Sequence, residues 1–173
     1  MPDSRFILSS FDPAPEQLAP GLRWRGFSDR VMGGVSEAEF GRDFIAGRRC
    51  IRLVGRVTRD RGGGFIQMAL DVGTRGRAFD ASAWSGVELE LFGNDEEYNL
   101  HLRTSDCGWY DDSYRLTFRV LPVWQTLRVP WSDLVPNSVE RPLNPARLER
   151  IAVLGWMREF DADVALARVA LYR

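Results

Sequence analysis

The stretch Tyr98–Arg103, which reads Tyr-Asn-Leu-His-Leu-Arg, alternates apolar and polar side chains at every position. Successive side chains of a β-strand point to opposite faces, so this pattern predicts a strand with one face in a core and the other in water. The same period recurs on both sides of it, in Val87–Leu91 and Tyr114–Val120. Strands with one wet face are typical of antiparallel sheets.

The rest of the chain repeats this period. Further strands are predicted at Phe6–Phe11, Leu22–Phe27, Cys50–Val57, Phe65–Leu70, Leu127–Val129, Ile151–Trp156 and Val164–Tyr172. Short helical turns are expected at Ala14–Ala19, Trp131–Leu134 and Pro145–Arg150. Roughly ten short strands separated by glycine and proline turns predict an all-β jelly-roll sandwich. We expect one domain that spans residues 1–173.

Composition excludes several classes of function. The 23 basic residues, all arginine, face 24 acids for a net charge of −1, which gives no global reason to expect a nucleic-acid partner. No run approaches the about 18 apolar residues that a membrane-spanning helix needs. Cys50 and Cys107 lie far apart and form neither a zinc pattern nor a disulfide framework. With no secretory or transit signal at the start, a cytoplasmic protein is expected.

Polar residues on three consecutive predicted strands suggest a binding patch. If these strands are neighbours in one sheet, their wet faces combine carboxylate, amide, imidazole and guanidinium groups that could hold a polar ligand or a partner. Ordinary cross-strand charge pairing explains the same pattern. The residues concerned are Glu88, Glu90, Asn99, His101, Arg103, Arg115 and Arg119.

Two loops carry further candidate residues. In Asp29-Arg30-Val31-Met32-Gly33-Gly34-Val35-Ser36 the adjacent glycines allow a positive φ or a close approach, and the Asp29 carboxylate can accept hydrogen bonds from backbone N–H groups. The stretch is either a functional loop or a tight connection at one end of the sandwich. Trp109 and Tyr110 lie outside any alternating run, where they either stack on sugars and anchor interfaces or fold back as a lid.

No catalytic or metal-binding constellation is evident. His101 is the only histidine, and acid–base catalysis would require a positioned partner such as Glu88 or Glu90. Those two glutamates could mimic a glycosidase pair, but nothing else builds a sugar cleft. Acids near Trp109 could bind calcium, although they follow no EF-hand spacing. We therefore expect a non-enzymatic binding domain with no cofactor and no metal site.

Several motifs together resemble one known family. Asp29–Ser36 is similar to the signature of the complex I intermediate-associated protein family, the NADH:ubiquinone oxidoreductase assembly-factor domain. Other segments follow in the family's order, namely Gly63-Gly64-Phe65, Trp84–Val87, Gly93-Asn94-Asp95 with Tyr98 and Arg103, Trp124 before Val129-Pro130-Trp131, Leu148–Gly155 and Val164–Tyr172. The resemblance covers nearly the whole chain.

The resemblance implies a galactose-binding-like jelly roll, related in shape to some carbohydrate-binding modules, and a chaperone-like role in holding intermediates of a protein complex. The chain departs from the family at Met68-Ala69-Leu70, near a position where an arginine is usual, and we expect it to be a bare domain. A bacterial stand-alone member is expected, with a respiratory-complex subunit or assembly intermediate as one candidate partner. The alternative is a module that binds carbohydrate or a small polar ligand through the polar sheet face, Trp109 and Tyr110.

Overall fold

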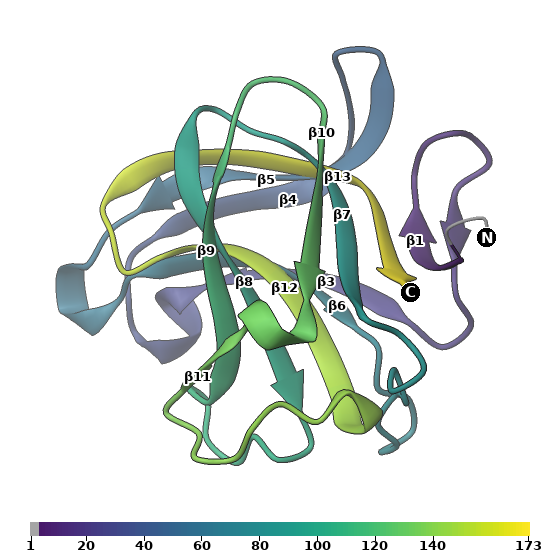
Figure 1. Cartoon of the computed structure of the whole chain (residues 1–173). Coiled ribbons are helices and arrows are strands. Elements are labelled where there is room, and N and C mark those ends of the chain that lie inside the picture. The colour runs from purple at the N-terminus through teal and green to yellow at the C-terminus, as the bar shows by residue number, and fades with distance from the viewer. Residues whose placement is uncertain (1–3) are drawn as a thin grey trace.

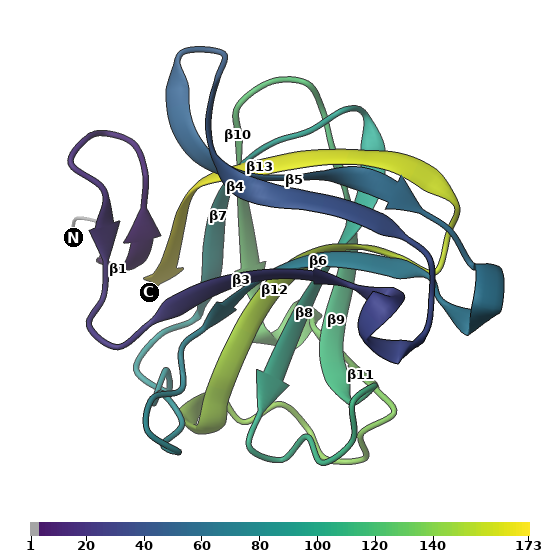
Figure 2. The same ribbon diagram turned by 180° about the vertical axis from the view of Figure 1, so that it is seen from behind.

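The computed structural model describes residues 4–173, which form two antiparallel β-sheets packed face to face (Figures 1 and 2). Sheet A runs in the order β10 (Gln125–Pro130), β7 (Gly86–Phe92), β13 (Phe160–Tyr172), β1 (Arg5–Ser10) and β2 (Gln17–Leu18). Strand β5 (Arg48–Val57) pairs with the first half of β13, and β4 (Glu37–Ile45) pairs with β5. Sheet B runs in the order β11 (Val135–Asn137), β9 (Ser113–Val120), β8 (Glu96–Thr104), β12 (Leu148–Trp156), β6 (Phe65–Asp71) and β3 (Arg23–Ser28).

The alternation of Tyr98–Arg103 is realised in β8. Tyr98, Leu100 and Leu102 are fully buried between the sheets, while His101 and Arg103 lie half-buried on the outer face of sheet B. Each such leucine contributes roughly 1.5–3 kcal/mol by its burial. The predicted all-β sandwich is confirmed, because the apolar faces of both sheets meet in one hydrophobic core.

Two predicted helical turns are confirmed and one is wrong. The 3₁₀ turns η3 (Trp131–Asp133) and η4 (Pro145–Arg147) lie where expected, and η1 (Asp29–Met32) and η2 (Asp60–Gly62) are additional. The segment Ala14–Ala19 instead contains strand β2, which pairs with β1. Backbone pairing with β1 holds Gln17 and Leu18 extended, and Pro15 disfavours a helical conformation at the residue before it.

Strand β4 was not predicted. It pairs with β5 over nine positions, but most of its side chains are exposed, so it carries no apolar alternation. Phe40 packs against the core, and backbone hydrogen bonds to β5 hold the rest of the strand. Hydrophobic periodicity cannot detect such a strand.

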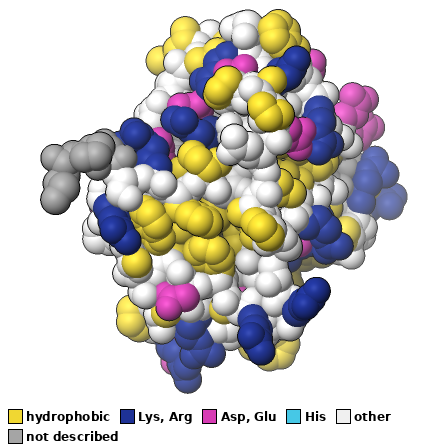
Figure 3. Space-filling view, turned by 90° about the vertical axis from the view of Figure 1, so that its right-hand side faces the viewer, with side chains coloured by type: hydrophobic (Ala, Val, Ile, Leu, Met, Phe, Trp, Pro, Cys, Tyr) yellow, Lys and Arg dark blue, Asp and Glu magenta, His cyan; other side chains and the backbone are white. Residues whose placement is uncertain are grey.

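The surface mixes charges of both signs. Figure 3 shows one face of the molecule, where apolar side chains form a band across the middle and arginines and acids are interspersed around it. This mixture agrees with a net charge of −1. Within residues 4–173, no helix is long and apolar enough to cross a membrane.

Candidate functional site on the outer face of sheet B

The outer face of sheet B is hollowed, and strand register decides which side chains line it. Phe27 of β3 lies in line with Gln67 of β6, Leu154 of β12 and Asn99 of β8. These positions alternate with core residues, so their side chains lie on the face away from sheet A. The resulting hollow has a volume of about 780 Å³.

One end of this hollow is apolar. Phe65 and Trp156 lie opposite each other on β6 and β12, and the loop residue Met157 follows directly. Met157 is 47% exposed and Met32, from η1, is 49% exposed. Exposed thioether groups are flexible enough to pack against apolar surfaces of different shapes.

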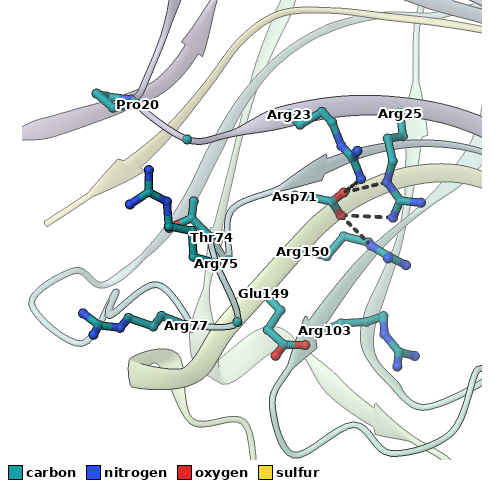
Figure 4. Close-up of a pocket in the computed structure, with 13 residues that line it drawn as sticks. Pro20, Arg23, Arg25, Asp71, Thr74, Arg75, Arg77, Arg103, Glu149 and Arg150 are labelled. Atoms are coloured by element: carbon teal, nitrogen blue, oxygen red, sulfur yellow. Dashed lines mark hydrogen bonds and ion pairs between the residues drawn. The ribbon is translucent and has the colours of Figure 1, made fainter.

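The other end is basic and opens into a second hollow of about 1180 Å³ that shares Arg103 and Arg150 with the first. Asp71 lies among Arg23, Arg25 and Arg150 on one side of this hollow (Figure 4). Its carboxylate accepts hydrogen bonds from Arg25 Nε at 2.5 Å and Arg150 Nε at 3.1 Å, and Arg23 approaches it at 3.5 Å. One carboxylate therefore serves three guanidinium groups.

Guanidinium groups also cover the aromatic rings of this face. Arg25 and Arg150 lie 5.3 and 5.9 Å from the centre of the Phe27 ring. Arg115 lies 5.1 Å from the Trp156 ring, and the edge of His101 packs against the same ring at 5.0 Å. These cation–π contacts hold the cations in place and occupy ring surface.

His101 reaches the hollow but is poorly suited to acid–base catalysis. Burial, together with the smaller effect of the nearby positive charge of Arg115, lowers its pKa to about 4. Its Nε2 is buried and finds no hydrogen-bond partner among residues 4–173. The imidazole is therefore neutral near pH 7.

Glu88 and Glu90 do not join His101. Their strand β7 belongs to sheet A, so the expectation that three consecutive strands are sheet neighbours is correct for β8 and β9 and wrong for β7. Glu88 is buried and bonds Arg5 Nε at 2.8 Å and Arg128 Nε at 2.7 Å. Glu90 bonds Arg48 and Arg168. Both carboxylates take part in an arginine ladder on sheet A.

Two other predicted residues are engaged in cross-strand pairing. The Asn99 Oδ1 accepts a hydrogen bond from the Thr117 hydroxyl at 2.9 Å. Arg119 pairs with Asp95 at 2.7 Å, with both side chains more than half exposed. For these two, ordinary pairing across the sheet describes what the structure shows.

The loop before β9 presents Trp109 and Tyr110 to solvent. Arg103 Nη1 donates to the carbonyls of Trp109 at 2.9 Å and Asp112 at 2.7 Å, and Asp112 in turn accepts from the Trp109 N–H at 3.0 Å. The two rings are 73% and 76% exposed, so the alternative of a lid folded over the sandwich is wrong. Tyr110 lines the hollow, whereas Trp109 is not among its lining residues.

Asp29 is a structural residue that joins two loops. Its fully buried carboxylate accepts hydrogen bonds from the Ser36 N–H at 2.9 Å, the Ser36 hydroxyl at 2.6 Å and the Gly64 N–H at 2.6 Å, with Phe65 N–H at 3.3 Å. Burial alone raises the pKa of Asp29, but these hydrogen bonds outweigh it and lower the pKa below its usual value. Asp29 is thus not free to bind a ligand.

The neighbouring glycines make room for this carboxylate. A Cβ added at Gly34 or at Gly63 would collide with the Asp29 side chain. Gly33 has a φ of 85° and ends η1 in the left-handed conformation that favours glycine. Arg30 Nε bonds the Ser36 carbonyl at 2.9 Å. Of this predicted loop, Val31 and Met32 present exposed side chains to the hollow, and the hydrogen bonds of the other residues favour the tight-connection interpretation for them.

Sequence reasoning missed Phe27, Arg25, Arg150 and Trp156. Arg25 and Phe27 share one face of β3, whereas Arg150 and Trp156 lie beside Asp71 and Phe65 of β6, so strand register rather than apolar alternation brings these residues together. Within residues 4–173, no group of three His, Cys, Asp or Glu side chains is placed to hold a metal ion.

The sequence matches the family described as complex I intermediate-associated protein 30 (CIA30) over residues 14–162. The chain belongs to the CIA30 family. A comparison with curated proteins gives no match.

Solved structures similar to this CIA30 chain include several carbohydrate-binding modules. The family 11 module of the cellulosomal cellulase Lic26A-Cel5E of Clostridium thermocellum has a TM-score of 0.73 at 11% identity, covering 97% of this chain and 94% of that one. The family 11 module from Clostridium thermocellum in complex with a β-1,3-1,4-mixed-linked tetrasaccharide has a TM-score of 0.71 at 10% identity, covering 96% and 94%. A family 30 module has a TM-score of 0.60 at 17% identity, covering 80% and 81%. These similarities confirm the predicted galactose-binding-like jelly roll.

Proposed function

We propose that this CIA30 chain is a non-catalytic, chaperone-like adaptor that holds a protein partner on the outer face of sheet B. Family membership supports an assembly-factor role, and a respiratory-complex subunit or an assembly intermediate is the partner we favour. Cys50 and Cys107 are both free thiols, as fits a bacterial cytoplasm.

The observation that carries this proposal is the apolar rim of the hollow. Val31 is 69% exposed and Tyr110 76% exposed, and both line the hollow together with Met32 and Met157. Exposed aliphatic, thioether and aromatic groups around a hollow are typical of protein interfaces. The neutral, unpartnered imidazole of His101 lies apart from Glu88 and Glu90, which supports binding rather than catalysis.

Site-specific photo-cross-linking tests the proposal. A photoreactive amino acid is placed at Tyr110 or Met32 on the rim, and at Phe44 as the control. Phe44 is 64% exposed and belongs to β4 in sheet A. We expect the two rim positions to give the same protein adduct in cells and Phe44 to give none. Absence of adducts, or the same adducts from Phe44, would refute the proposed interface.

Carbohydrate binding is the second candidate function. It is favoured by the exposed rings of Trp109 and Tyr110, since exposed aromatic faces stack on sugars. A related fold holds a mixed-linked tetrasaccharide. Calorimetry with that tetrasaccharide, on wild type and on the Trp109→Ala, Tyr110→Ala double variant, separates the two functions. Tetrasaccharide binding by wild type that the double variant abolishes would favour carbohydrate as the ligand. No tetrasaccharide binding by wild type would favour the protein partner.

A further inference from the structure

We infer that the basic end of the outer face of sheet B binds the carboxylates of an acidic peptide segment of the protein partner, while an apolar side chain of the same segment rests on Met32 and Met157. The inference rests on the proposed function, because it names the part of the partner that the hollow accepts.

Guanidinium groups from three strands gather at this end, and two of them bond one carboxylate. Arg25 lies on β3, Arg150 on β12 and Arg103 on β8, with Asp71 on β6. Asp71 uses Nε and Nη2 of Arg25 and Nε of Arg150. Within residues 4–173, Nη1 of Arg25 and both terminal nitrogens of Arg150 donate no hydrogen bond to the protein. Donors and positive charge therefore remain for a further carboxylate.

These donors are held in position and point the same way. Arg25 and Arg150 lie over the Phe27 ring, and Arg103 is fixed by the carbonyls of its neighbouring loop. Figure 4 shows the terminal nitrogens of all three turned to the same side, whereas Arg75 and Arg77 point away from Asp71. A guanidinium that is already fixed loses little conformational freedom when it binds an anion.

The crowding of positive charge also appears in the titration behaviour of Arg150. Burial lowers its pKa, and the charges of Arg25 and Arg103 lower it further, against the opposing effect of Asp71. A second carboxylate at this point would relieve the repulsion among the three cations.

The hollow suits a peptide better than an acidic sugar. The rings of Phe27 and Trp156 are covered by guanidinium groups, so they offer little bare surface for a sugar. The exposed Met32 and Met157 instead offer flexible apolar surface. Trp156 follows Arg150 by six positions on β12, and at about 3.3 Å per position the two residues lie about 20 Å apart along the strand. An extended peptide would therefore place its apolar residue about six positions from its acids.

A peptide array probed with the purified full chain tests this inference. The array places Glu or Asp at every spacing from Leu or Phe, and an isosteric set replaces the acids with Gln or Asn. We expect the acidic peptides to bind and the amide set to bind at least about tenfold more weakly, a loss of about 1.4 kcal/mol. Because this comparison uses the unmodified protein, it does not depend on the folding of a variant.

Protein variants test the same contact from the other side. The Arg25→Gln, Arg150→Gln variant should weaken acidic-peptide binding at least about tenfold. The Arg48→Gln, Arg168→Gln control removes the same charge from sheet A, where both side chains are 26% exposed against 33% and 27% for Arg25 and Arg150. It should leave binding within about twofold, because it touches no part of the hollow.

Three results would overturn the inference. Equal binding of acidic and amide peptides would show that the peptide carboxylates do not contribute to binding. Equal losses of peptide affinity in the two double variants would show that only the net charge of the protein matters. Tighter binding of oligogalacturonate than of any acidic peptide would identify an acidic sugar instead. If Tyr110 still cross-links a protein in any of these cases, the proposed function stands and this inference alone fails.

Discussion

Replacing Gly63 with alanine should destabilise the protein only while Asp29 is present. The three atoms nearest to an added Cβ at Gly63 all belong to the Asp29 carboxyl group. Gly63 has a φ of −78°, which alanine adopts without strain, so the cost is steric. Overpacking of this kind costs about 2 kcal/mol in the free energy of unfolding.

Asp29→Ala should cost about 4 kcal/mol, since buried N–H and O–H donors left without an acceptor cost about 1–3 kcal/mol each. In the Asp29→Ala background the clash disappears. The double variant should therefore lose about 4 kcal/mol of the free energy of unfolding, rather than the about 6 kcal/mol expected for independent effects. Urea unfolding followed by tryptophan fluorescence measures all three variants. Additive effects within about 0.5 kcal/mol would refute the coupling between Asp29 and Gly63.

Other predictions concern single residues. His101 should titrate near pH 4 by NMR. Because its pKa in the unfolded chain is about 6.5, its contribution to the free energy of unfolding is complete above about pH 6.5 and is lost as the pH falls toward 4. The His101→Gln variant should remove this pH dependence. A titration near pH 6.5 would contradict its burial. Trp109→Ala should change the free energy of unfolding by less than about 0.5 kcal/mol, because the ring is exposed. Chemical denaturation checks this, and a larger loss would mean that the ring packs against the protein. Glu88→Ala should cost about 2 kcal/mol, since the buried carboxylate balances arginines on sheet A; unchanged thermal melting would contradict that role.

Period-two alternation predicted most of the fold because a buried face leaves a clear pattern. It identified β7 and β8, whose sequences alternate apolar and polar residues, but not β4, whose side chains are largely exposed. It also failed at Ala14–Ala19, where backbone pairing with β1 determines the conformation. Elements held by hydrogen bonds alone leave little trace in hydropathy.

The site was harder to predict because alternation assigns a residue to a face but not to a sheet. His101 and Glu88 follow the same rule in adjacent predicted strands, yet β8 and β7 belong to opposite sheets and their polar faces point away from each other. Arg25 and Arg150 lie far apart in the chain and meet only because β3 and β12 both pair with β6, on either side of Asp71. The Asp29 loop shows the converse: its sequence resembles the family's signature, but its buried carboxylate joins two loops at one wall of the hollow. A pattern that resembles a family signature can therefore support a surface, while the side chains of the proposed binding surface lie in the less conspicuous strands beside it.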